Sequence, residues 1–177
     1  GGALRAGGGE EPGSDRAGGY AHFHTVPVPT EEATFEAWTV TAGLVRDTQR
    51  VRVGQMVTCN GYRSPALLAK MASTVDVMSH GRLDVGIGAG WYEHEYTAYG
   101  YPFPPAAVRL RMLAEALPIM HPLWAEASAT FAGEHSQVHG AINEPKGGHR
   151  PHPPLWISGA GAPSGLGDGA LFDLGDG

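Results

Sequence analysis

Cysteine, basic residues and long apolar runs are all scarce in this sequence. The single cysteine, Cys59, excludes an internal disulfide framework and a multi-cysteine zinc site. Twelve Lys and Arg face 18 Asp and Glu, for a net charge of −6, so the chain has no basic footprint for nucleic acid. No apolar run approaches the ~20 residues that span a membrane, and the N-terminus lacks the apolar core of a signal peptide. We therefore expect a cytoplasmic protein that binds neither nucleic acid nor membrane.

Glycine is concentrated at the two ends of the chain. Of 27 glycines, eight lie in residues 1–19 and seven in residues 159–177. These ends have almost nothing to bury, so residues 1–19 and 162–177 are expected to be poorly packed tails around a domain at 20–161. At 177 residues the chain can hold one core, but it is shorter than the ~250 residues of a complete eight-stranded α/β barrel.

Between these tails, strand-like and helix-like patterns alternate, which predicts βα units and a parallel sheet. The expected strands are 20–28, 51–59, one opening at Arg82, and 155–157. The expected helices begin at Thr30, at Ser64-Pro65 and near Val108, and the second should stop at Gly81. Pro118 predicts a kink or an early stop in the third helix, and residues 125–150 predict a hairpin.

The stretch from Arg82 to Pro105 is expected to be the centre of the molecule. Its first half alternates apolar residues with Asp and Gly, which indicates a strand. This strand ends in glycines and enters a loop rich in aromatic rings, from Trp91 to Phe103, and in α/β barrels such strand ends carry the chemistry. The alternative is a packed surface loop. The glycine spacing fails the dinucleotide-binding pattern, because Trp91 occupies the place of the third glycine.

Two histidines, His22 and His24, allow two functional interpretations. On one face of a strand they would ligate a metal, as in barrel hydrolases. Alternatively, one of them faces the barrel mouth as a proton acceptor. The structural alternative is a pair of half-buried histidines without a role.

Other polar residues near the expected strand ends are weaker candidates. Cys59 is expected to be a small buried hydrophobe rather than a nucleophile. Arg63 would meet an anion or solvate a loop. Glu93, His94 and Glu95 form a possible polar rim, with the two acids expected to be solvated.

Long motifs of the chain resemble a known family. V-R-V-G-Q-M-V-T-C-N-G-Y-R-S-P, G-R-L-D-V-G-I-G-A-G-W-Y-E-H-E-Y and R-P-H-P-P-L-W-I-S-G occur in the order found in bacterial luciferase-like flavin oxidoreductases. The match covers about residues 22–161 and is nearest to the branch that uses coenzyme F420. The resemblance implies an α/β fold, a partial (β/α)8 TIM barrel holding about units 2–5. It also implies F420, or alternatively flavin mononucleotide (FMN), at the strand ends.

The resemblance further assigns roles to individual residues. It makes His22 the catalytic base near the reactive ring carbon. Met56 and Val57 match the place where some members carry a non-prolyl cis peptide behind the ring. The remaining cofactor-binding positions it implies are Cys59, Asn60, Gly88, Ala89, Gly90, His94, Ser158 and Gly159.

The expected function is hydride transfer between a small organic substrate and F420, in a parent protein that forms a homodimer. Alternatives are an FMN-dependent monooxygenase, a metal-dependent hydrolase using His22 and His24, or an inactive fragment. Departures from the family pattern support the last of these: Ala21 replaces the usual aspartate, residues 1–19 match nothing, and the last three βα units are missing after Gly161. An internal piece of this kind is expected to show marginal stability, association or loss of activity.

Overall fold

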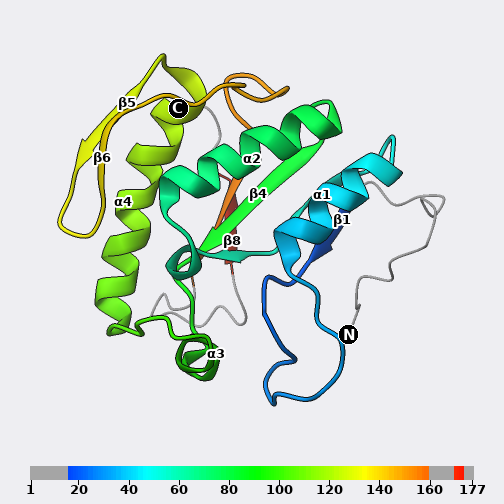
Figure 1. Cartoon of the computed structure of the whole chain (residues 1–177), viewed down its shortest axis with the longest axis vertical. Coiled ribbons are helices and arrows are strands. Elements are labelled where there is room, and N and C mark those ends of the chain that lie inside the picture. Colours follow the sequence, from blue (N-terminus) through cyan, green and yellow to red (C-terminus); the bar gives the residue numbers. More distant parts are fainter. Residues whose placement is uncertain (1–15, 160–169, 174–177) are drawn as a thin grey trace.

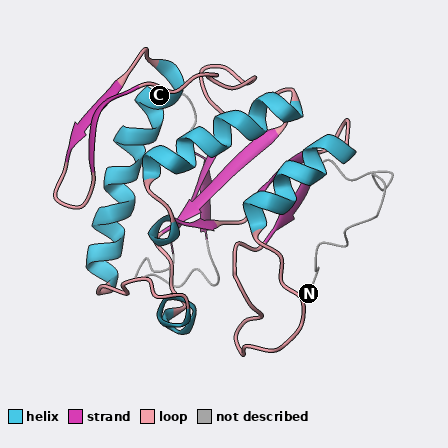
Figure 2. Cartoon of the chain, in the orientation of Figure 1, coloured by secondary structure: helices cyan, strands magenta, loops and turns pink. Residues whose placement is uncertain are grey.

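A computed structural model describes residues 16–159 and 170–173 of the chain. Strands and helices alternate along most of it (Figures 1 and 2). The elements are β1 (Arg16–Gly19), α1 (Ala37–Asp47), β2 (Arg52–Gln55), β3 (Thr58–Cys59), the 3-10 turn η1 (Asn60–Tyr62), α2 (Pro65–Ser79), β4 (Leu83–Gly88), α3 (Glu93–Ala98), α4 (Ala106–Ala125), β5 (Ala129–Ala132), β6 (Gln137–Ala141), β7 (Leu155–Gly159) and β8 (Ala170–Asp173).

The main sheet has the strand order β1-β2-β4-β7-β8, with β3 also paired to β4. All pairings from β1 to β7 are parallel, and β8 runs antiparallel to β7. Figure 1 shows α1 and α2 lying side by side across one face of this sheet, with α4 at its flank. The fold is therefore α/β with the parallel sheet of a partial barrel, as predicted.

The core lies between the sheet and the helices. Leu83, Val85 and Ile87 of β4 are fully buried, and they pack in one cluster with Trp38 of α1 and Leu68 of α2. This confirms the strand predicted from Arg82 onward. Among the described residues, no helix combines the length and apolarity needed to cross a membrane.

The predicted strand at residues 20–28 is wrong. The segment is irregular, and the strand lies just before it, at Arg16–Gly19, where it pairs with β2. Sheet hydrogen bonds use only backbone groups, so a glycine-rich segment can pair without offering side chains to bury. The amide of Phe23 instead binds the Glu95 carboxylate. Of the expected tails, residues 1–15, 162–169 and 174–177 lie outside the described residues. The division of the chain into tails and a core stays a prediction.

Three other element boundaries differ from expectation. Helix α1 begins at Ala37 rather than at Thr30, because the Glu36 carboxylate caps the amides of the first turn. The strand expected at 51–59 is divided into β2 and β3 at the Met56–Val57 peptide bond, which is cis. Helix α4 continues through Pro118 to Ala125, since buried residues after the proline hold the last turns against the core. The hairpin predicted within 125–150 is confirmed as β5–β6.

Candidate functional site

A cavity of about 460 Å³, here called the main cavity, opens at the carboxyl edge of the parallel sheet. Segments that follow β1, β3 and β4 converge there, together with the first turn of α4. This edge is where parallel α/β sheets and barrels bind ligands. The lining residues are Tyr20, Ala21, His22, Val26, Met56, Val57, Thr58, Cys59, Tyr62, Gly88, Ala89, Gly90, Trp91, Tyr92, Glu95, Ala106, Arg109, Leu110 and Ser158.

Glu95 holds the polar centre of the main cavity. Helix α3 turns this side chain inward, where only 1% of it is exposed, while Glu93 remains exposed. One carboxylate oxygen accepts hydrogen bonds from His22 Nδ1 at 3.0 Å and from the Tyr62 hydroxyl at 2.6 Å, and the other accepts from the amide of Phe23. Burial alone would raise the pKa of this carboxyl. Its hydrogen bonds, first that from His22, outweigh burial and hold the pKa below its ordinary value.

The ionised carboxylate fixes the orientation of the His22 ring. A carboxylate only accepts, so Nδ1 of His22 carries the proton and Nε2 is the nitrogen available to a ligand. Trp91 and Tyr92 meet the ring edge-on, with centroids 5.7 and 6.1 Å away. The hydrogen bond to Glu95 thus orients the His22 ring with Nε2 available at the cavity wall.

A second polar contact joins Cys59 to Tyr96 at 2.8 Å between Sγ and the hydroxyl. Burial raises the pKa of the Cys59 thiol and also that of the Tyr96 hydroxyl, so both keep their protons at neutral pH. Gly90 lies against this pair with φ +81°, and a Cβ there would approach the tyrosine hydroxyl to 2.2 Å. Only glycine fits the turn.

Apolar side chains form the rest of the wall. Met56 and Trp91 line the cavity while 52% and 55% exposed. Arg109 of α4 lines it too, donating to the carbonyls of Gly90 (3.2 Å) and Pro104 (2.5 Å) and lying over the Phe103 ring. Among the described residues, no carboxylate forms an ion pair with Arg109. The wall therefore combines broad apolar surfaces with one fixed cation.

Most of the predicted site residues meet in the main cavity. His22, Met56, Val57, Cys59, Gly88, Ala89, Gly90 and Ser158 all line it. Asn60 is buried and lines a neighbouring side cavity of about 390 Å³ instead. His94 is exposed and contacts His24, and Gly159 is the last residue of β7. Whether these residues bind a cofactor stays a prediction.

Sequence reasoning missed Glu95, Tyr62 and Arg109. The expectation of a solvated acid holds for Glu93 and is wrong for Glu95, which is buried among aromatic rings. A carboxylate inside the run W-Y-E-H-E-Y was the available signal, because an acid among aromatic residues needs a partner when buried. Arg63, left open between an anion site and a solvated loop, pairs with Glu36 at 2.5 Å.

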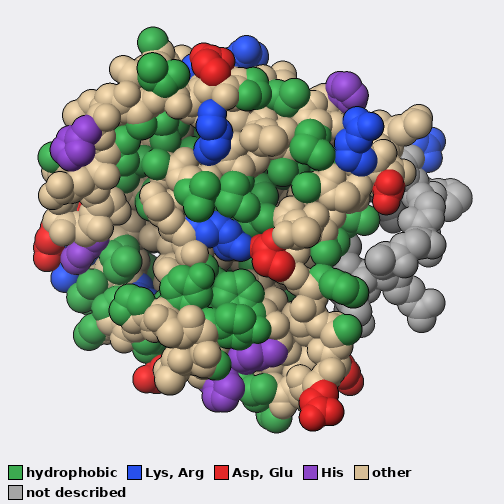
Figure 3. Space-filling view, in the orientation of Figure 1, with side chains coloured by type: hydrophobic (Ala, Val, Ile, Leu, Met, Phe, Trp, Pro, Cys, Tyr) green, Lys and Arg blue, Asp and Glu red, His purple; other side chains and the backbone are tan. Residues whose placement is uncertain are grey.

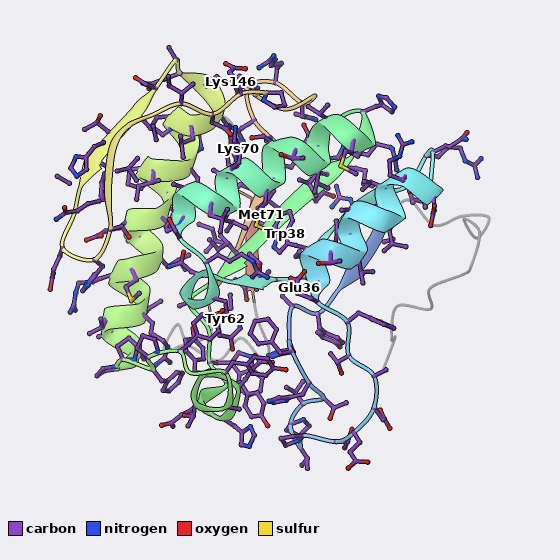
Figure 4. The ribbon with its side chains drawn as sticks, in the orientation of Figure 1. Glu36, Trp38, Tyr62, Lys70, Met71 and Lys146 are labelled. Carbon is purple, nitrogen blue, oxygen red and sulfur yellow. The ribbon has the colours of Figure 1, made fainter. Side chains whose placement is uncertain are left out.

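The structure does not bring His22 and His24 together as metal ligands. His22 binds Glu95, whereas the ring of His24 contacts Tyr92 and His94. Figure 4 labels Tyr62, the other side chain that donates to Glu95. Within residues 16–159 and 170–173, no three His, Cys, Asp or Glu side chains are grouped closely enough to hold a metal.

Comparison with known proteins agrees with this architecture. A family model described as luciferase-like monooxygenase matches residues 13–170. An FMNH2-dependent dimethylsulfone monooxygenase of Pseudomonas putida is 29% identical over 125 residues, 71% of this chain and 34% of that protein. A pyrimidine monooxygenase, RutA, of Acinetobacter baylyi is 34% identical over 105 residues, 58% of this chain and 28% of that protein.

A solved structure gives the same result in three dimensions. An F420-dependent secondary alcohol dehydrogenase in complex with an F420-acetone adduct superposes with a TM-score of 0.72 at 27% identity, covering 83% of this chain and 44% of that one. The chain thus spans less than half the length of each of these relatives. Its sequence, its parallel sheet and the position of its main cavity lead to one assignment: the chain belongs to the luciferase-like monooxygenase family.

Proposed function

We propose that this chain forms the strand-end wall of a two-electron oxidoreductase that transfers hydride between a small organic substrate and coenzyme F420. The observation that carries the proposal is the His22–Glu95 pair, which sets a proton acceptor on the wall of an otherwise largely apolar cavity. The similarity to an F420-dependent alcohol dehydrogenase supports it. FMN-dependent oxygenation is the second candidate, supported by the two monooxygenase relatives.

The residues present fit a flat, anionic cofactor. Met56 and Trp91 offer apolar surface on the cavity wall, and Gly88 and Gly90 leave the strand end free of side chains. Arg109 would hold a phosphate of the cofactor, because its charge meets only carbonyls and an aromatic ring among the described residues. A deazaflavin or flavin bound here supplies the two-electron redox chemistry.

The protein's own part is to move one proton and to exclude water. His22 Nε2 accepts the proton that a hydroxyl substrate loses when it is oxidised, and Glu95 stabilises the imidazolium that results. Trp91 and Tyr92 cover the ring and keep water from it. A positioned base of this kind contributes about 10²–10⁴-fold to rate.

Cofactor retention tests the proposal directly. The purified chain is incubated with F420 or with FMN and gel-filtered, and the absorbance that travels with the protein is read. Retention of F420 supports hydride transfer, retention of FMN alone favours the oxygenation alternative, and retention of neither contradicts both.

A variant pair then tests the role of His22. In an F420-loaded protein, His22→Gln is expected to lower turnover by about 10²–10⁴-fold while retention of F420 is unchanged. His139→Gln, an exposed histidine on β6, is the matched control and should leave both unchanged. Equal turnover in the two variants would remove His22 from the reaction.

A further inference from the structure

His24 and His94 belong to segments far apart in sequence and meet beside Tyr92, which lines the main cavity. His24 lies in the segment between β1 and α1, and His94 lies in the first turn of α3. Their rings are 5.2 Å apart, and His24 Nε2 lies 3.4 Å from His94 Nδ1. Figure 3 shows histidine side chains gathered at the lower edge of the molecule, where Figure 1 places α3. Both side chains are open to solvent, half-buried in His24 and exposed in His94.

The hydrogen bonds fix which nitrogen of His24 carries a lone pair. His24 Nδ1 lies 3.1 Å from the carbonyl oxygen of Thr25. A carbonyl only accepts, so Nδ1 donates and Nε2 of the neutral ring is free to accept. Metal-binding histidines characteristically donate their other ring N–H to a backbone carbonyl in this way.

The distance between the two nitrogens matches that of two ligands on one metal ion. Zinc binds imidazole nitrogen at about 2.0–2.1 Å in tetrahedral geometry, which places two such nitrogens about 3.3–3.4 Å apart. The observed separation is 3.4 Å. Metal binding would replace the hydrogen bond between the rings, with the proton of His94 Nδ1 released or moved to Nε2.

We infer that His24 and His94 form a two-histidine site for a borderline transition-metal cation such as Zn²⁺. Imidazole is a suitable ligand for Zn²⁺, Ni²⁺ and Cu²⁺ and a poor one for Mg²⁺. Within the described residues there is no third His, Cys, Asp or Glu in the group, so water completes the coordination. The Tyr92 ring contacts both histidines, with centroids 5.5 Å from His24 and 5.8 Å from His94.

Such a site would join two segments that border the main cavity, residues 20–36 and residues 89–98. The two segments already meet through the Tyr92 hydroxyl, which donates to the carbonyl of Pro27 at 2.8 Å. Val26 from the first segment and Trp91 from the second both line the cavity. A bound metal adds a second crosslink beside this hydrogen bond and thereby restricts opening of the cavity rim.

Metal titration of the whole chain tests the inference without any cofactor. Isothermal titration with Zn²⁺ should show one equivalent bound, and Mg²⁺ should show none. His24→Gln and His94→Gln should each weaken Zn²⁺ binding at least about tenfold. The matched control is His139→Gln, since His139 is also exposed but lies on β6 away from the pair.

A second measurement on the unchanged sequence locates the ion. Paramagnetic Cu²⁺ should broaden the amide signals around residues 24 and 94 first in a ¹⁵N correlation spectrum. Absence of Zn²⁺ uptake, uptake that survives both substitutions, or broadening elsewhere would each overturn the inference.

Discussion

Glu95 is the residue on which the hydrogen bonds of the site converge. Replacing it with alanine would leave the Tyr62 hydroxyl, the Phe23 amide and His22 Nδ1 without their shared acceptor. Unpaired buried donors cost free energy, so Glu95→Ala should lower the free energy of unfolding by about 3 kcal/mol. Urea unfolding followed by circular dichroism measures this. Glu93→Ala, on the same helix but exposed, should change it by no more than about 0.5 kcal/mol, and similar losses in both variants would contradict the assigned network.

Cys59 gives a chemical test of the same cavity wall. Because burial raises the pKa of its thiol, the reactive thiolate is scarce in the folded chain. Iodoacetamide at pH 8 should therefore alkylate Cys59 more slowly in buffer than in denaturing urea, as followed by mass spectrometry. Equal rates in the two conditions would place the thiol in open solvent.

Helix α4 continues through Pro118, where the sequence predicted a kink or an early stop. Pro118 lies on the exposed side of the helix interior, where it removes an N–H donor and cannot gain from burial. Pro118→Ala should raise the free energy of unfolding by about 1–2 kcal/mol, since restored helix propensity exceeds the entropy that proline removes from the unfolded chain. Pro105→Ala at the N-cap is the control and should have little effect in the same urea titration, because the carbonyl of residue 105 still accepts from Val108 and Arg109 and no helical hydrogen bond needs an N–H there. A loss of stability in Pro118→Ala would show that the proline ring itself packs.

Elements with a strong local pattern were predictable, and those defined by distant partners were not. The alternation of β4, the Ser64-Pro65 start of α2 and the β5–β6 hairpin follow from neighbouring residues alone. The pairing of β1 depends on β2, 36 positions further on in register, and its glycines give no side-chain signal.

The same limit applies to the site. The end of β4 was placed correctly because glycines and aromatic residues mark it locally. Glu95, however, binds His22 across 73 positions and Tyr62 across 33, and such pairings leave no periodic pattern in one sequence.

For the whole molecule, three carboxylates contribute to the response to acid. Hydrogen bonds outweigh burial and hold the pKa values of Glu36, Glu95 and Glu115 below the ordinary 4.5. The main donor is the Thr39 side chain for Glu36, the His22 ring for Glu95 and the amides of the hairpin turn for Glu115. A folded pKa below the unfolded one means that the stabilisation is complete above about pH 4.5 and is lost as the pH falls through the folded value. The urea midpoint should therefore fall between pH 5 and pH 3.

Variants of one of these carboxylates separate this effect from general charge repulsion. Glu115 receives the amides of residues 134–136 at the hairpin turn, so Glu115→Gln should reduce the dependence of the urea midpoint on pH. Glu134→Gln, whose side chain is 70% exposed, should retain the dependence of the parent chain. If the urea midpoint of Glu115→Gln depends on pH as strongly as that of the parent chain, the amide hydrogen bonds to Glu115 do not favour its ionised form.

The position of β4 in the sheet has a consequence for synthesis on the ribosome. Its partners β2 and β3 precede it in the chain, whereas β7 on its other side begins at Leu155, 67 positions after β4 ends at Gly88. At about 5–20 residues per second, the emerging chain carries an open strand edge at its centre for roughly 3–13 seconds. During that interval β4 is the segment that a holding chaperone would protect, and slow codons between residues 88 and 155 would lengthen its exposure.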